Sequence, residues 1–173
     1  QDRLLVIRER GTQPGPPFLS CDMMTLPGGA RAGEEFETMK SIRSYLVFDF
    51  ETTGLDVDQD RIIQVGLCVV SDGMVAERHD WLVRQDVPID PEATKVHGIM
   101  AEHVQSRGIS PLESLARLFE AIRNAPACVG HNIHRFDIRF MGAESRRLGV
   151  TPPDQRNFID TAALFKGWRL GLR

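Results

Sequence analysis

Apolar residues along this chain fall first into short runs of strand length and later into stretches with helical spacing. Residues 44–50 (SYLVFDF) are rich in aromatic and β-branched side chains, which is typical of a buried strand. Two further strand-like runs, residues 61–70 and 74–83, flank residues 71–73 (SDG), and an Asp-Gly pair between such runs favours a hairpin. The pattern predicts three consecutive strands that form an antiparallel meander.

Helical spacing begins at residues 110–113 (SPLE), a capping box with proline at the first helical position. The apolar residues that continue this spacing are Leu112, Leu115, Ala116, Leu118, Phe119 and Ile122. A short apolar run at 127–130 predicts a buried strand, and residues 134–148 predict a second helix that ends at a glycine. The same order follows once more, with a strand at 157–160 and the start of a helix at 161–168. A meander followed by strand–helix alternation predicts an α/β fold with a mixed sheet flanked by helices.

The first 42 residues lack this regularity. Residues 11–33 are dense in glycine and proline, which is typical of a loop or linker. Residues 4–7 could form an isolated strand and residues 34–41 a short helix. We therefore predict a partly irregular arm or linker over 1–42 and one α/β domain over 43–173.

Composition supports a globular protein. Of the 173 residues, 42% are hydrophobic and 26% are charged, and the length suits one domain. No apolar run approaches the roughly 20 residues that span a bilayer. The cysteines, Cys21, Cys68 and Cys128, match no zinc or disulfide pattern and favour reduced thiols in a cytoplasmic protein.

The sharpest chemical feature is the pair of carboxylates, Asp49 and Glu51, at the end of the first predicted strand. Residues two apart on a strand point the same way, so these side chains lie next to each other. A cation relieves their repulsion, and hard ions such as Mg²⁺ or Mn²⁺ prefer carboxylate oxygens. The plainer alternative is a strand that simply ends in solvent.

A second polar segment, residues 130–137 (GHNIHRFD), lies where a predicted strand meets a helix. Asp137 falls in the first turn of that helix, where the helix dipole favours a carboxylate, and this dipole effect is its plainer explanation. We expect His131 to be structural and His134 to be exposed or to face a substrate. The arginines of this helix, interpreted as a solvated face or as phosphate contacts, are Arg135, Arg139, Arg146 and Arg147.

Taken together, FDFETTG at residues 48–54 and HNIHRFD at residues 131–137 resemble the first and second motifs of the DEDD exonuclease superfamily. They are most similar to the DnaQ-like branch, which includes the proofreading subunit of bacterial DNA polymerase III, and residues 96–99 (VHGI) match a further segment of that branch. The second motif has one extra residue within 133–135. The resemblance covers residues 44–165 and implies an RNase H-like fold.

The resemblance also implies roles for individual residues. Asp49, Glu51 and Asp137 correspond to catalytic ligands of two Mg²⁺ or Mn²⁺ ions. Asp49 would bridge both ions, Glu51 would bind the one that carries the attacking water, and Asp137 would hold the other mainly through water. In this scheme one ion generates hydroxide and the other stabilises the leaving 3′-oxygen.

The backbone after the first motif would line the terminal nucleotide, with Leu55 wedged against its base. The candidate substrate-binding residues are Thr52, Thr53, Gly54, Leu55, His97 and Asn132. His97 has an equally strong alternative as a loop histidine that caps nearby backbone.

Members of this branch carry a third motif, a histidine followed five residues later by an aspartate, which supplies the general base and completes one metal shell. The sequence has no such pair, and none of its five histidines follows His134. We therefore expect an exonuclease domain truncated before the third motif, and nearly inactive by itself. Asp160 could replace the missing carboxylate, but its place before TAALF favours a helix N-cap.

The resemblance implies a metal-dependent 3′–5′ exonuclease that releases nucleotides from 3′ ends in DNA replication or repair, with DNA expected before RNA. The net charge of −3 does not exclude this function, because an acidic site attracts metal ions that then meet phosphates. Two alternatives are an RNA-trimming exoribonuclease and a catalytically degenerate module that binds nucleic acid or a protein partner. The arm over 1–42 could join the domain to a polymerase or another protein.

Overall fold

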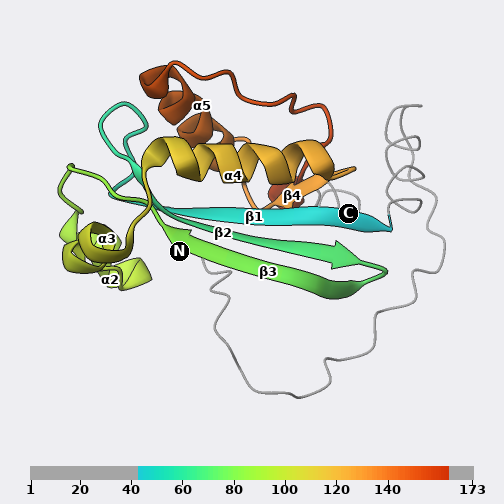
Figure 1. Cartoon of the computed structure of the whole chain (residues 1–173), viewed down its shortest axis with the longest axis horizontal. Coiled ribbons are helices and arrows are strands. Elements are labelled where there is room, and N and C mark those ends of the chain that lie inside the picture. The colour runs from blue at the N-terminus through green and yellow to red at the C-terminus, as the bar shows by residue number, and fades with distance from the viewer. Residues whose placement is uncertain (1–42, 164–173) are drawn as a thin grey trace, which may run out of the picture.

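Five strands form one mixed sheet, in the order β3-β2-β1-β4-β5, in the computed structural model, which describes residues 43–163 (Figure 1). The strands are β1 (Ser44–Thr52), β2 (Ile62–Ser71), β3 (Met74–Leu82), β4 (Cys128–Gly130) and β5 (Phe158–Asp160). β1, β2 and β3 pair antiparallel, whereas β1, β4 and β5 pair in parallel. The predicted meander and the predicted mixed α/β sheet are both confirmed.

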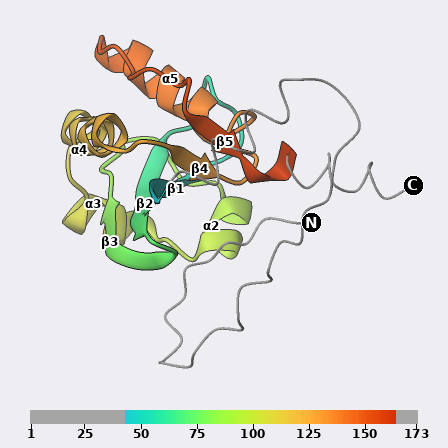
Figure 2. The ribbon, with the colours of Figure 1, turned by 90° about the vertical axis from the view of Figure 1, so that its right-hand side faces the viewer.

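Within residues 43–163 the sheet is accompanied by the helices α2 (Pro91–His97), α3 (Ala101–Arg107), α4 (Pro111–Asn124) and α5 (Asp137–Leu148). Figure 2 shows α4 and α5 on one side of the sheet and α2 on the other. The core lies under α4 and α5, where Leu46 and Phe48 of β1 join Leu118 of α4 and Phe140 of α5 in one buried cluster. Within the described residues, no helix is long and apolar enough to cross a membrane.

The capping box before α4 is present. Ser110 lies at the N-cap, and its hydroxyl oxygen accepts a hydrogen bond from Glu113 N at 3.2 Å. Leu115, Leu118, Phe119 and Ile122 form the buried stripe, as predicted. Leu112 and Ala116 do not belong to it, since both are exposed. At about 100° per residue they lie toward the flank of the stripe, which the linear spacing did not resolve.

Two predictions about helices need correction. The second-motif helix begins at Asp137 rather than at residue 134, because the chain first turns through Asn132, whose φ is 58°. Hydrophobic spacing did not predict α2 and α3, which have seven residues each and too few apolar positions for a periodic signal. A local signal for α2 was present, since Asp90 caps Pro91–His97 and accepts a hydrogen bond from Glu92 N at 2.8 Å.

Several predictions fall on residues outside 43–163. These are the strand at 4–7, the linker at 11–33, the helix at 34–41 and most of the helix at 161–168, of which residues 161–163 are described and helical. The division into an arm over 1–42 and a truncated domain over 43–173 therefore stays a prediction.

Candidate active site

The two carboxylates of the first motif lie on the opposite face of β1 from its core residues. Phe48 and Phe50 are buried, while Asp49 is exposed and Glu51 is half-buried. Alternate residues of a strand point to opposite faces, so the core packing of Phe48 and Phe50 aims Asp49 and Glu51 the other way. The two carboxylates thus share one side of the strand near its end, as the sequence predicts.

Asp137 meets this strand end through the backbone. Phe50 N donates a hydrogen bond to Asp137 Oδ1 at 3.1 Å. Leu46 N donates to Ala127 O, so alternate N–H groups of β1 point toward β4. β4 ends at Gly130 while β1 runs on to Thr52, and the Asp137 carboxylate takes the place of a strand acceptor beyond that end. The second motif therefore contacts the backbone between Asp49 and Glu51.

The start of α5 holds Asp137 in place. Asp137 is only 2% exposed and lies in the first turn, where the helix dipole stabilises its negative charge. Phe140 is fully buried and packs against Phe136, with 4.7 Å between the ring centroids. Ile133, also fully buried, fills the space beside Gly130, where an added Cβ would come within 2.6 Å of the Ile133 side chain. Core packing on both sides of the turn thus fixes the position of Asp137.

The donor set fits a hard divalent cation in its chemistry. Asp49 and Glu51 lie at the end of β1, and Asp137 contacts the backbone between them; carboxylate oxygens are the ligands that Mg²⁺ and Mn²⁺ prefer. Within residues 43–163, however, no three His, Cys, Asp or Glu side chains stand as a group ready to hold an ion. Because Asp137 is buried and bonded to the Phe50 backbone, Asp49 and Glu51 would have to turn toward Asp137 for the three carboxylates to share an ion.

The loop over residues 53–61, which follows β1, closes on itself. Thr53 N donates to Arg61 O at 2.9 Å, and the Thr53 hydroxyl donates to Asp60 Oδ1 at 2.7 Å. Asp56 N donates to Asp60 Oδ2 at 2.8 Å. A Cβ on Gly54 would lie 2.5 Å from that oxygen, so the close approach of Asp60 requires glycine. The sequence analysis did not single out Asp60, which organises this loop.

The candidate substrate residues of this loop differ in what they can offer. Thr52 and Thr53 are 5% and 0% exposed, and the Thr52 hydroxyl donates to Gly54 O at 2.6 Å. Their side chains are therefore internal to the loop, and Gly54 is buried as well. Leu55 is 76% exposed and presents an apolar side chain outward. Among these four, Leu55 is the one that a substrate can meet directly.

Asn132 is held by Asp160. Asn132 N donates to Asp160 Oδ1 at 2.8 Å, and His134 N donates to Asp160 Oδ2 at 3.4 Å. Ala162 N also donates to Oδ1, at 2.9 Å, which confirms the predicted helix N-cap. Burial raises the pKa of Asp160, but hydrogen bonds from the backbone of Ala162, His134 and Asn132 outweigh it and lower the pKa below its usual range. Asp160 thus links β5 to the second-motif turn.

The two histidines of the second motif are both exposed. His131 Nδ1 lies 3.0 Å from the hydroxyl oxygen of Thr161, within hydrogen-bond distance, and the Thr161 hydroxyl also donates to Gly130 O at 3.2 Å. His131 thus makes a structural contact, as we expected. His134 was expected to be exposed or to face a substrate, and it is exposed.

His97 caps its own segment. Its Nδ1 accepts a hydrogen bond from Ile99 N at 3.0 Å, so the proton of the neutral ring lies on Nε2. Nε2 is buried near the Thr52 backbone but makes no hydrogen bond within the part of the chain that the structure describes. Burial lowers the pKa of His97, against a smaller opposing effect of the Thr52 backbone. These contacts match the alternative in which His97 caps nearby backbone, and they place its ring next to the backbone of Thr52.

Curated relatives include PolC-type DNA polymerases III of two bacteria. This chain is 33% identical over 130 residues to a DNA polymerase III PolC-type of Streptococcus suis. The aligned region covers 75% of this chain and 9% of the relative. The PolC-type polymerase of Thermotoga petrophila is 29% identical over 123 residues, covering 71% of this chain and 9% of the relative. The chain therefore spans about a tenth of the length of these relatives.

Solved structures with the same fold include Escherichia coli exonuclease I in complex with a dT13 oligonucleotide, with a TM-score of 0.65, 20% identity, and coverage of 73% of this chain and 29% of that one. A product-bound exonuclease I has a TM-score of 0.68 and 19% identity, covering 75% of this chain and 32% of its own. The RNase H-like fold is thereby confirmed. The exonuclease family model RNase T matches residues 46–172, so the chain belongs to this family, and the resemblance to the DnaQ-like branch of DEDD 3′–5′ exonucleases is confirmed.

Proposed function

We propose that this chain is a 3′–5′ exonuclease module that hydrolyses the terminal phosphodiester of a DNA strand and releases nucleotides. The observation that carries this proposal is the hydrogen bond from Phe50 N to Asp137 Oδ1, 3.1 Å long, which brings the second-motif carboxylate to the first-motif pair. Two motifs 87 positions apart thus meet at one strand end. A helix-terminal charge or a solvent-exposed strand end would not require this contact.

The three carboxylates would act together on the scissile phosphate. Asp49 and Glu51, side by side on β1, would hold divalent cations that Asp137 approaches from α5. When bound, Mg²⁺ or Mn²⁺ supplies positive charge that favours ionised water and stabilises the departing oxygen. The buried position of Asp137 would keep its charge fixed during the reaction, since its backbone partner belongs to the sheet.

The substrate would approach over the 53–61 loop. Leu55 is the exposed apolar group next to the carboxylates in sequence, and it would press against the terminal base. His97 would cap its own segment through Ile99 N, with its buried Nε2 near the Thr52 backbone, rather than contact the nucleotide. Asn132, whose backbone N–H is bonded to Asp160, would face the DNA strand near Asp137.

DNA is the proposed substrate because the PolC-type relatives are DNA polymerases and the Escherichia coli exonuclease I structure contains an oligodeoxynucleotide. The same proposal includes a role in replication or repair and a cytoplasmic location. It also includes a polymerase as partner, in the same chain or in another one. Comparing release from all-DNA strands with release from strands that end in one ribonucleotide tests the choice of sugar, because the 2′-hydroxyl is the group that distinguishes them.

The decisive experiment follows the stepwise shortening of a 5′-labelled single strand by the full-length protein with Mg²⁺ or Mn²⁺. Asp49→Ala should lower turnover on the order of 100-fold or more, because charge stabilisation by a bound ion supplies several kcal/mol to such reactions. Asp49 is exposed, so the variant should keep its circular dichroism spectrum and unfolding midpoint. Glu120→Ala, which removes an exposed carboxylate from α4 on the other side of the sheet, is the matched control. Full hydrolysis by Asp49→Ala would refute the proposal, and DNA binding without any hydrolysis by the parent would indicate the degenerate module instead.

A further inference from the structure

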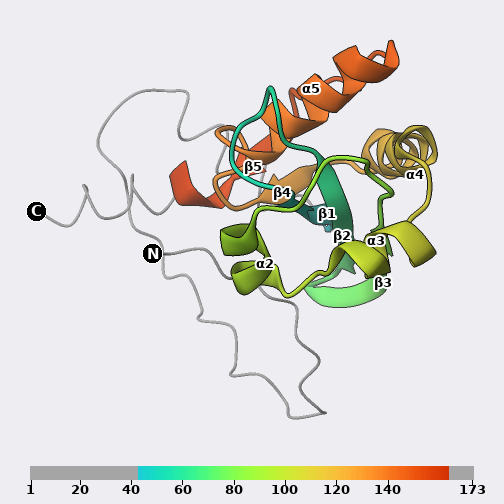
Figure 3. The same cartoon turned by 90° about the vertical axis from the view of Figure 1, so that its left-hand side faces the viewer.

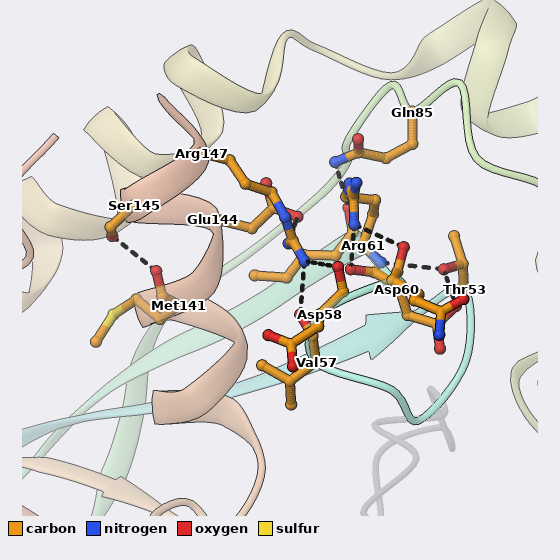
Figure 4. Close-up of polar contacts among 12 residues, drawn as sticks. Thr53, Val57, Asp58, Asp60, Arg61, Gln85, Met141, Glu144, Ser145 and Arg147 are labelled. Carbon is orange, nitrogen blue, oxygen red and sulfur yellow. Dashed lines mark hydrogen bonds and ion pairs between the residues drawn. The ribbon is translucent and has the colours of Figure 1, made fainter. Parts of the chain in front are cut away.

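Helix α5 contacts the first-motif region near both of its ends. In its first turn, Asp137 Oδ1 accepts the hydrogen bond from Phe50 N at 3.1 Å. In its last turn, Arg147 Nη2 donates to Val57 O at 2.6 Å and to Asp58 O at 2.9 Å. Figure 3 shows the loop after β1 beside α5, and Figure 4 shows Arg147 reaching to Val57 and Asp58. One helix therefore positions a carboxylate of the site and also the loop that carries Leu55.

Glu144, one turn earlier in α5, forms an ion pair with Arg147 and so braces its guanidinium. Arg147 Nη1 lies 3.1 Å from Glu144 Oε1, and the two side chains are 24% and 5% exposed. Burial raises the pKa of Glu144, against the opposing effects of Arg147 and Arg61. With both terminal nitrogens engaged, the planar guanidinium is held in one orientation. The Arg147 side chain is thus held by contacts within the protein, although the residue is exposed as the sequence predicts.

The 53–61 loop has hydrogen bonds within itself as well as contacts with the rest of the protein. Asp60 joins Thr53 to Asp56, and Arg61 Nη1 donates to Gln59 O at 2.6 Å and Asp60 O at 2.9 Å. These contacts are all internal to the loop. The outer part of the loop is joined to the rest of the protein by the packing of Val57 against the core and by the hydrogen bonds from Arg147. Val57 and Asp58 are the outer residues that Arg147 grips, two and three positions from Leu55.

We propose that Arg147, braced by Glu144, is a positioning residue that fixes the 53–61 loop, and with it Leu55, relative to Asp137. This inference rests on the proposed exonuclease function but concerns a residue outside its motifs. Displacement of a substrate-orienting group by about 1 Å can lower the reaction rate by a large factor. The hydrogen bonds from Arg147 to the loop would therefore affect the rate without any contact between Arg147 and the substrate.

The first test measures the loop itself. Hydrogen–deuterium exchange is followed in the full-length protein for peptides that cover the 53–61 loop and, as an internal reference, the turn between β2 and β3. Arg147→Ala should speed exchange in the loop several-fold and leave the reference turn unchanged, because the amides of a released loop open more often. Arg146→Ala removes the neighbouring exposed charge and should change neither segment. Unchanged exchange in the loop of Arg147→Ala would overturn the proposal.

The second test asks whether Arg147 acts through Leu55. In a double-mutant cycle, Arg147→Ala should lower kcat/KM on a single-stranded oligonucleotide by about tenfold in the parent and by less than about twofold in a Leu55→Ala background. Equal losses in both backgrounds would mean a general structural effect and would overturn the proposal. If Arg147→Ala reduces the folded fraction, Arg147→Lys serves instead, because a lysine loses the fork that bridges Glu144 and the loop.

The two proposals fail in different ways. If the parent protein releases no nucleotides, the exonuclease proposal fails, while the exchange experiment still decides whether Arg147 anchors the loop. If the parent is active but the double-mutant cycle is additive, the exonuclease proposal stands and the positioning role is refuted.

Discussion

Asp137 Oδ1 accepts a hydrogen bond from the backbone N–H of Phe50 at 3.1 Å, across 87 positions of sequence. Phe50 itself is 3% exposed, so its N–H has no water to replace this partner. The carboxylate consequently has two tasks, one in the fold and one in the proposed chemistry. Substitutions that separate these tasks are informative.

Asp137→Asn and Asp137→Ala form such a pair. Asn keeps an oxygen that can accept from Phe50 N, so it should change the free energy of unfolding by less than about 1 kcal/mol, whereas Ala leaves a buried N–H unpaired and should cost about 1–3 kcal/mol. Both variants should lose most metal-dependent hydrolysis, since neither carries the negative charge. Urea unfolding without metal and a nucleotide-release assay measure the two effects. Equal stability of the Asn and Ala variants would contradict the structural task.

Gly54→Ala tests the close packing of the loop after β1. A Cβ at this position would lie 2.5 Å from Asp60 Oδ2, so the substitution must displace the contacts of Asp60 and should cost about 1–3 kcal/mol. Gly142→Ala is the matched control within α5, where the nearest atom to an added Cβ is Arg146 Nη1 at 3.7 Å. It should stabilise the protein by about 0.5–1 kcal/mol, because alanine is the better helix former. Thermal unfolding of both variants decides, and a gain in stability from Gly54→Ala would refute the packing argument.

Asp160 should make the stability of the protein depend on acid pH. Four backbone N–H groups outweigh burial and lower the pKa of this carboxyl in the folded state. The stabilisation is therefore complete above the unfolded value of about 3.9 and is lost as the pH falls through the lower folded value. Asp160→Asn should be less stable by about 1–3 kcal/mol at pH 7, and the difference should shrink below about pH 4.

Urea unfolding of parent and variant between pH 2 and pH 7 checks this expectation. Asp154→Asn is the control, because Asp154 is an exposed carboxyl whose pKa is also lowered, chiefly by its hydrogen bond with Arg156. Solvent screens that pair, so its removal should change stability little at any pH. A difference between parent and Asp160→Asn that stays constant over the whole range would contradict the assignment.

Much of the fold could be predicted from short-range patterns. The SDG turn between two strand-like runs predicted the meander, and the SPLE capping box predicted the start of α4. The short helices α2 and α3 could not be found by periodicity, because seven residues hold at most two helical turns. The start of α5 was misplaced because the positive φ of Asn132 is a backbone state that hydrophobic spacing does not encode.

The sequence by itself determined the chemical identity of the candidate site. Asp49 and Glu51 must share a face of a strand because side chains alternate with a period of two, and Asp137 must lie in a first helical turn because a strand and a turn precede it. Only the tertiary structure decided that Asp137 caps the N–H of Phe50, that Asp160 holds the second-motif turn, and that Arg147 grips the loop of Leu55. Each of these contacts joins residues at least 28 positions apart, and their distances depend on how the core packs α5 against the sheet, which no local pattern specifies.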